Sequence, residues 1–393
     1  MSEVKTVETN RWQVALKDIA AGSVVRTLLS VFLGFLVGAI FMAAFNAEVQ
    51  TAFAYFFSRP GDAFLAVAKV IGDGYGALLR GAIFNPQATD LVSAFRPITE
   101  TLRMAAPLIA AALGIGLGFR VGLFNIGGTG QIVFGLLGIG WITTRVEMPA
   151  GIHLVVAILV AIVFAALWGS IVGYLKAKTG AHEVIVTIML NYVAINLFTF
   201  FLRTPGLLLE AGGQGNPKSD PPAGGAMLPG LFGSDFRLSW GFVLAILATL
   251  VYWWLMDRST IGYRFKMVGH NSDAARAAGV NVERTYMWAM AASAAFMGVA
   301  AANQGLTVIG GLTPSIHANI GFDAITVALL GGSRPLGIFA AGLVFGAFKA
   351  GGPAMQVIGI SPEVLGIVQA LIVLFIAAPP LIRALFRLPE AKK

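Results

Sequence analysis

The sequence predicts an all-α fold, a polytopic membrane bundle of about ten transmembrane helices, some discontinuous, with both termini in the cytosol. Of its 393 residues, 57% are hydrophobic and 12% are charged, about half the charged share of an ordinary soluble domain. The mean hydropathy is +0.80. Apolar runs recur at lengths that cross a hydrocarbon core of about 30 Å at 1.5 Å per residue. These observations disfavour a water-soluble enzyme.

The charge and cysteine counts exclude further classes. The formal net charge is +8, but the basic residues flank apolar runs, which is typical of orientation signals and not of a phosphate-binding stripe. We therefore expect membrane lipid, and no nucleic acid polymer, around this chain. The absence of cysteine excludes disulfides, thiolate metal sites and cysteine nucleophiles.

The predicted spans follow from a hydropathy window of about 19 residues. The run 322–333 is too short to cross straight, and Gly331 and Gly332 interrupt it, so we expect half of a discontinuous helix within the protein. In chain order, the spans are expected at 25–46, 101–119, 129–144, 152–174, 184–203, 238–256, 286–306, 322–333, 337–354 and 363–380.

The distribution of bases predicts the orientation. An even number of spans places a tail at 1–23 and a tail at 386–393 on one side, with the transmembrane domain covering 24–385. We expect that side to be the cytosol, because the connection 257–285 is rich in arginine and lysine and cytosolic loops carry such an excess.

Two segments are expected on the extracytoplasmic side. Residues 204–237 hold only two bases, Lys218 and Arg237, and their Gly- and Pro-rich stretch predicts a flexible surface excursion. In the segment 47–97, the part 51–85 is moderately apolar and interrupted by Gly72, Asp73, Gly74 and Gly76. That pattern favours a helical hairpin on the outer surface, and the alternative is an eleventh and a twelfth span.

The first candidate stretch for chemistry is 118–135. It holds too many glycines for an unbroken helix and carries Asn125, Thr129 and Gln131 where apolar residues are expected. Backbone groups at a helix interruption are tolerated only where protein or a water-filled cavity satisfies them, which indicates a path for a polar solute. The alternative is a kink that Asn and Gln stabilise without touching solute. The phosphate-loop motif occurs nowhere, so no ATP site is predicted.

The second stretch is 179–198. Asn191 lies about eight residues inside the predicted span, about 12 Å deep by helix rise, and an intramembrane amide is expected to face the bundle interior. Val186 stands where a metalloprotease motif needs its second histidine. Helix capping is favoured over proton relay for Glu183.

The third stretch is 257–288. Asn271 or Ser272 can cap a short helix, Asp273 favours the positive N-terminal end of that helix, and Gly279 can stop it. The surface that we expect this helix to present to a partner's groove consists of Ala274, Ala275, Ala277 and Ala278. The alternative is an ordinary cytosolic connection.

The fourth stretch is 320–342. Phe322 and Asp323 open a short span that glycines and Pro335 then interrupt. Asp323 is favoured as a helix N-terminal residue over a cation or proton site. Together with 118–135 this makes two interrupted hydrophobic segments, a pattern that predicts a site between two halves of a transporter.

Four motifs together resemble the permease subunit of bacterial ABC importers for nucleosides and simple sugars, in the branched-chain amino acid and ribose permease superfamily. They are GLFNIGGTGQIVFG (122–135), GAHEVIVTIMLNYVA (180–194), GHNSDAARAAGV (269–280) and GFDAITVALLGGSRPLG (321–337), and their span covers roughly 98–380. One departure is Gly128-Thr129, where the family commonly has a small residue followed by an acid. It puts a carboxylate role there in doubt.

The resemblance implies a multi-pass permease of the bacterial inner membrane whose partners are a cytosolic ABC ATPase, a second and shorter permease subunit, and an extracytoplasmic substrate-binding lipoprotein. The chain itself would bind no cofactor and no metal, since the ATPase uses the ATP and Mg. The substrate path would be lined by Phe124, Asn125, Thr129, Gln131, Asn191 and Phe322. The segment that couples to the ATPase would comprise Gly269, Asn271, Ser272, Asp273, Ala274, Ala275, Arg276, Ala278 and Gly279.

Alternatives to nucleoside import stay open on the sequence. The same architecture can import ribose or another simple sugar. A secondary transporter would couple solute to ions through Glu183 or Asp323. A channel or scaffold is a third possibility, whereas an intramembrane enzyme is disfavoured because the four histidines lie in separate segments.

Overall fold

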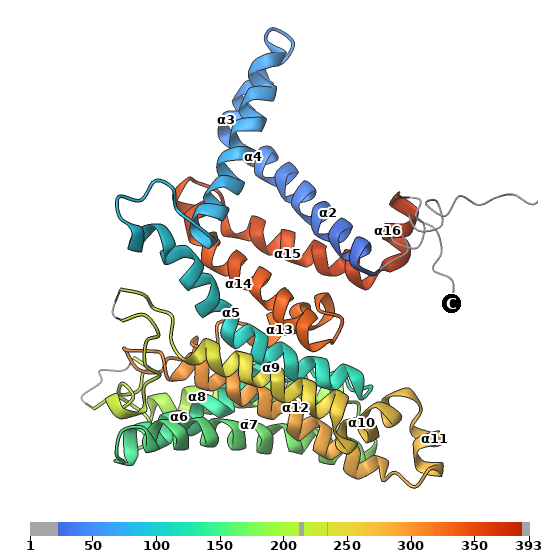
Figure 1. The fold of residues 1–393 in the computed structure, drawn as a ribbon. Coiled ribbons are helices and arrows are strands. Elements are labelled where there is room, and N and C mark those ends of the chain that lie inside the picture. The colour runs from blue at the N-terminus through green and yellow to red at the C-terminus, as the bar shows by residue number, and fades with distance from the viewer. Residues whose placement is uncertain (1–22, 212–215, 234, 387–393) are drawn as a thin grey trace, which may run out of the picture. The chain divides into compact units, whose positions relative to one another are not determined.

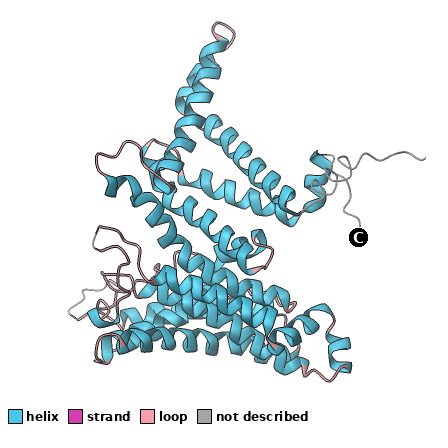
Figure 2. Ribbon diagram, viewed as in Figure 1, coloured by secondary structure: helices cyan, strands magenta, loops and turns pink. Residues whose placement is uncertain are grey.

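The computed structural model describes residues 23–211, 216–233 and 235–386, and within them every regular element is helical (Figures 1 and 2). An isolated antiparallel bridge joins Gly230 and Ser239. The predicted all-α fold is confirmed. The expected tails 1–23 and 386–393 lie almost wholly outside the described residues. The chain divides into two compact units, residues 1–77 with 352–393, and residues 78–351.

The first unit contains a bent pair of helices near its start. Helices α2 and α3 meet at 67°, where Asn46 accepts hydrogen bonds from the Glu48 and Val49 amides and so caps α3. Gly34 and Gly38 let α2 approach α15 closely, because a Cβ at either would meet Ile372 or Val368 within 2.5 Å. The helices that lie in this unit, wholly or in part, are α2 (Ser23–Ala44), α3 (Ala47–Ala54), α4 (Pro60–Ala82), α14 (Pro335–Val357), α15 (Pro362–Ala377) and α16 (Pro379–Phe386).

The second unit is built around α5, whose residues 105–118 are all buried. Helix α12 lies tightly against α7: a Cβ at Gly169, Gly173 or Gly298 would come within 2.7 Å of the facing helix. Small residues thus let these helix backbones approach closely. The first 17 residues of α14 (335–351) belong to this unit as well. Its other helices are α5 (Leu91–Arg120), α6 (Gly128–Arg145), α7 (Ile152–Thr179), α8 (Glu183–Arg203), α9 (Gly241–Arg258), α10 (Thr260–His270), α11 (Ser272–Ala277), α12 (Val282–Gly305) and α13 (Ile320–Leu330).

All ten predicted spans are helical, and six to eight are long and apolar enough to cross a membrane. Six single helices qualify, and two more spans are added if each bent pair, α2 with α3 and α15 with α16, counts as one. The other two predicted spans, α6 with 18 residues and α13 with only 11, are not among these candidate spans. The short run forms a helix of its own, α13, which ends where Gly331 and Gly332 follow; that it is half of a discontinuous helix stays a prediction.

Two expectations for connecting segments need correction: the glycine interruption within 51–85, and the flexibility of 204–237. Helix α4 runs unbroken through Gly72, Asp73, Gly74 and Gly76, since Gly74 fits against Met42 and Ile360. The described part of the loop 204–237 is hydrogen-bonded to distant backbone. The Ser219 amide donates to the Leu312 carbonyl oxygen (3.0 Å), and the Leu228 amide donates to the Leu306 carbonyl oxygen (2.9 Å). Composition alone did not reveal these long-range contacts.

Candidate functional site

The predicted interruption after α5 is confirmed. Helix α5 ends at Arg120 and α6 begins at Gly128, with an irregular connection between them. Gly122 in this connection has φ +76°, a conformation that glycine adopts without strain. The backbone groups that the break frees must find partners inside the protein, and amide side chains supply several of them.

A closed network of buried polar side chains holds this break. Asn125 and Gln131 exchange two hydrogen bonds, at 3.0 and 3.1 Å. The Asn125 amide also donates to the Ser293 hydroxyl (2.9 Å), which in turn donates to the Gly114 carbonyl oxygen (2.7 Å). Asn125 and Gln131 are at most 1% exposed. In this conformation they form the stabilised kink that we gave as the alternative to solute contact.

Asn191 of α8 also holds the break through hydrogen bonds to its backbone. Its side-chain oxygen accepts from the Gly130 amide (2.7 Å), and its side-chain nitrogen donates to the Ile126 carbonyl oxygen (3.0 Å). The expectation that this amide faces the bundle is confirmed. Glu183 at the start of α8 pairs with Lys176 (2.5 Å) and accepts from the Phe124 amide (3.4 Å), so the carboxylate is already engaged by a cation.

Helices α13 and α6 meet at their N-termini. A Cβ at Gly321 would lie 2.2 Å from the Thr129 amide nitrogen and 2.5 Å from the Gly128 carbonyl carbon, so the two backbones touch. This contact brings the two interrupted segments together, and a solute site between two halves of the protein stays a prediction. Asp323 in the first turn of α13 pairs with Lys349 of α14 (2.7 Å).

The six residues predicted to line a path therefore fall into two groups. Asn125, Gln131 and Asn191 are bonded to one another or to the break, with the half-buried Thr129 beside them. The side chains of Phe124 and Phe322 are 42% and 66% exposed, and the Phe124 ring lies 5.0 Å from the Phe119 ring. Their role in a solute path stays a prediction.

The segment 269–280 has the predicted local structure. Asn271 caps α11 by accepting from the Asp273 and Ala274 amides, both at 3.0 Å, and Gly279 follows the helix with φ +83°. The predicted exposure of Ala275 is wrong: it is 1% exposed because it packs against Val268 and Val282. The exposed residues of the segment are His270, Asn271, Asp273, Ala274, Arg276, Ala277, Ala278 and Gly279.

The α10–α11 segment is joined firmly to the transmembrane helices. Gly269 lies against the Arg120 backbone, where a Cβ would be 2.3 Å from the carbonyl oxygen. Asp257 pairs with both Arg120 (2.9 Å) and Lys266 (2.8 Å), which ties α5, α9 and α10 together. A displacement of α11 would therefore be transmitted to two spans.

A hollow of about 800 Å³ lies beside this segment, between α9, α10 and the start of α12. Ala278 and Gly279 form part of its wall, together with the bases Arg264 and Arg284 and the exposed Trp288. An indole, two guanidinium groups and a small-residue wall form a surface suited to an acidic protein partner.

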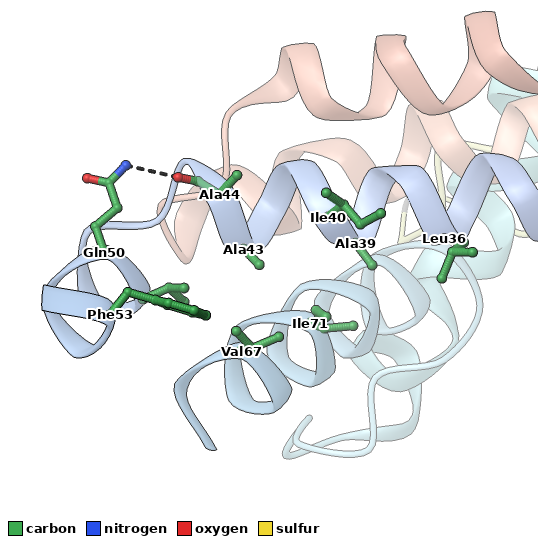
Figure 3. A pocket seen from close by; sticks show the side chains of 10 residues that line it. Leu36, Ala39, Ile40, Ala43, Ala44, Gln50, Phe53, Val67 and Ile71 are labelled. Carbon is green, nitrogen blue, oxygen red and sulfur yellow. Dashed lines mark hydrogen bonds between the residues drawn. The ribbon is translucent and has the colours of Figure 1, made fainter. Parts of the chain in front are cut away.

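The first unit carries a different kind of cavity, an apolar groove of about 440 Å³ between α2, α3 and α4 (Figure 3). Leu36, Ile40, Phe53 and Ile71 are among its lining residues. Its polar lining side chain, Gln50, donates to the Ala44 carbonyl oxygen. Such a groove fits a hydrocarbon chain and not a polar solute.

Sequence reasoning missed two residues of the site. Ser293 sits in an alanine-rich stretch of α12 and completes the network around Asn125. Lys349 lies within the span α14 and neutralises Asp323. A lone lysine inside an apolar span is itself a signal, because such a charge needs a partner.

Comparison with known proteins finds a matching protein family. Residues 98–377 match the family model "Branched-chain amino acid transport system / permease component". The chain is 35% identical to the guanosine ABC transporter permease protein NupP of Bacillus subtilis over 324 residues (80% of this chain, 87% of that protein). It is 31% identical to the nucleoside ABC transporter permease protein NupB of Lactococcus lactis over 379 residues (93% of each).

A sugar permease is also similar. The glucose ABC transporter permease protein TsgB13 of Haloferax volcanii is 33% identical over 296 residues (71% of this chain, 75% of that protein). No solved structure matches the chain.

Proposed function

Because the chain belongs to the family of branched-chain amino acid transport system permease components, we propose that it is the permease subunit through which an ABC importer takes up nucleosides. The observation that carries the proposal is the similarity to NupB over 93% of both chains and to NupP over most of both. The protein is a multi-pass membrane protein.

The proposed energy source is a separate ATPase that docks on the α10–α11 segment. Support comes from the exposed Ala274, Ala277 and Ala278 and from the basic hollow beside them. Closure of the ATPase would push α11, and the contacts of Gly269 and Asp257 would pass the movement to α5 and α9. The bundle would thereby alternate between outward-open and inward-open forms. ATP and Mg belong to the ATPase, and this chain binds neither.

Two further partners complete the proposed importer. An extracytoplasmic lipoprotein would deliver the solute, and a second, shorter permease would pair with this one. Helix α8 offers a face for that pairing: Ile185, Met189 and Tyr192 are more than half exposed, and Asn196 is exposed on the same face. The Asn196 Nδ2 donates to the Tyr192 carbonyl oxygen (2.8 Å). The rest of the amide would still face lipid, which is costly and favours a protein partner here.

Cross-linking tests the α8 face, and the chain is suited to it because it has no native cysteine. Met189→Cys and Asn196→Cys should each form a disulfide with a cysteine on the second permease. Val163→Cys on α7, which is exposed to a similar degree, is the matched control and should not. Equal cross-linking at all three positions would reject α8 as the interface.

Uptake assays test the main proposal. Cells that express the complete importer should accumulate guanosine, and a hydrolysis-deficient ATPase should abolish uptake while this chain stays in the membrane. Uptake that follows a proton or sodium gradient without ATP would favour the secondary transporter. Glu183 and Asp323, the carboxylates that it would use, are already paired with lysines.

The competing substrate is a simple sugar, which the similarity to a glucose permease favours. Equilibrium binding to the purified lipoprotein distinguishes the two. Guanosine binding without ribose or glucose binding supports nucleoside import, and the reverse result replaces it with sugar import.

A further inference from the structure

A small polar cavity of about 120 Å³ lies in the second unit, between α5, α9, the end of α12 and the loop before α13. It is large enough for several water molecules or one small polar ring. The side chains of Met104, Pro107 and Phe242 give it an apolar wall. The polar side chains that line it are Arg103, Ser239, Asn303, Gln304 and Thr307.

Several polar atoms in this cavity are free to bind a ligand. The Arg103 Nε donates to Glu100 (2.8 Å), and among the described residues its two Nη atoms have no hydrogen-bond partner. The Gln304 Nε2 donates to the Ile316 carbonyl oxygen (2.9 Å), and within the described part of the chain no donor is bonded to its Oε1. Asn303 is only 5% exposed, and its Nδ2 donates to the Val299 carbonyl oxygen (3.3 Å).

The loop that closes the cavity is strained. Ala318, which lines it, and the adjacent Asn319 have φ values of +44° and +56°, a left-handed conformation that costs free energy in residues other than glycine. Gln304 holds this loop at Ile316, and Lys349 holds it at the Ala318 carbonyl oxygen (3.4 Å). Backbone strain of this kind gathers at ligand sites.

The side chains that line the cavity favour a neutral, hydroxylated ligand. Glu100 balances the charge of Arg103, so the cavity has no excess charge to attract an anion. Its guanidinium and serine groups donate, and its amide oxygens accept. A hydroxyl can do both at once, and the apolar wall suits the carbon face of a sugar ring.

The cavity also lies away from the ATPase-docking segment. It adjoins Ser239, just before α9, whereas the other end of α9 leads into α10. The 18 residues of α9 are about 27 Å long at 1.5 Å per residue. Solute entering the bundle from that end would meet this cavity before the break near Asn125.

We propose that this cavity binds the hydroxylated sugar ring of the solute at the mouth of the bundle opposite α10–α11, and that Arg103 and Gln304 determine the preference for its hydroxyl groups. The proposal rests on the proposed nucleoside import and assigns the part of the solute that this pocket recognises.

The test is a ratio of uptake rates in proteoliposomes that contain the complete importer. Guanosine is compared with 2′,3′-dideoxyguanosine, which lacks the 2′- and 3′-hydroxyls of the ribose. Gln304→Met removes the open acceptor. Arg103→Met combined with Glu100→Gln removes the guanidinium without stranding a carboxylate. Each should lower the guanosine preference, by at least tenfold for the arginine variant, because a hydrogen bond to a charged group is the stronger kind.

Two controls accompany these variants. Glu100→Gln alone keeps the guanidinium and should keep the preference. Arg145→Met removes an arginine that donates to the Leu207 carbonyl oxygen outside the cavity, and it too should keep the preference. A wild-type ratio near one, or a loss that is equal for both solutes in the cavity variants, would overturn the proposal.

A different result would overturn the proposed function. If the wild-type importer takes up glucose and not guanosine, nucleoside import is wrong. The same variants are then compared on glucose against 2-deoxyglucose, and an unchanged ratio would overturn the sugar site as well.

Discussion

Gly321 is the residue at which the two interrupted segments touch. The atoms that a Cβ would meet there are backbone atoms of Gly128 and Thr129, the nearest at 2.2 Å, and backbone cannot turn aside as a flexible side chain can. The predicted helix break rested on Gly331 and Gly332, whereas the need for glycine at 321 follows from the packing of α13 on α6.

Gly321→Ala should therefore destabilise the protein by about 1–3 kcal/mol or more through overpacking. Gly72→Ala is the control: Gly72 lies inside a helix with no atom near its Cβ position, so alanine there should be neutral or stabilising by up to about 1 kcal/mol. Thermal unfolding in detergent measures both. Equal melting temperatures for the two variants would contradict the close contact.

His317 should make the stability of the protein depend on pH. Burial lowers its pKa below the ordinary value of 6.5, and its Nδ1 accepts from the Asn319 amide (3.3 Å), which requires a neutral ring. The unfolded state binds the proton more readily, so this contribution to stability is present above pH 6.5 and falls as the pH drops through that value.

Wild-type protein should therefore melt at a lower temperature at pH 5.5 than at pH 7.5, and His317→Asn should show a smaller difference. Asparagine keeps an acceptor near the same position without a group that titrates in this range. A pH-induced shift of the same size in both proteins would assign the effect to other groups.

Within the α10–α11 segment, different alanines serve folding and docking. Ala275 packs against Val268 and Val282, whereas Ala278 is exposed at the edge of the basic hollow. Ala278→Asp should leave the melting temperature nearly unchanged, since surface substitutions usually change stability by at most about 0.5 kcal/mol. It should nevertheless lower solute-stimulated ATP hydrolysis by the reconstituted importer.

Ala275→Asp is the contrasting variant. It buries an unpaired carboxylate, so it should reduce stability and ATP hydrolysis together. If Ala278→Asp leaves both stability and coupling intact, docking of the ATPase on this face is wrong.

Helices were predictable here because hydropathy and glycine spacing are local properties. The ten segments, the break after α5 and the cap at Asn271 each depend on a few neighbouring residues. The site depended on distant ones: Ser293 meets Asn125 across 168 positions, and Lys349 reaches Asp323 from another helix. An amide in a span could be assigned to the interior, but whether it faces solute or another amide depends on packing that periodicity does not encode.

At the scale of the whole molecule, the orientation rests on an asymmetry of charge. Arg258 ends α9, and four further bases, Arg264, Lys266, Arg276 and Arg284, follow it, whereas the segment before it holds Lys218 and Arg237. Because basic residues favour the cytosolic side, α9 should cross the membrane with its end at Arg258 inside. The proposed importer needs this orientation, since its ATPase is cytosolic.

Single-cysteine labelling tests the orientation without background, because the chain has no native cysteine. Phe232 is 61% exposed before α9, and Ala278 is exposed after it. A membrane-impermeant maleimide should label Phe232→Cys in intact cells and Ala278→Cys only after permeabilisation, with the unmodified chain as the blank. The reverse pattern would place the α10–α11 segment outside, where no ATPase could reach it, and would overturn orientation and coupling together.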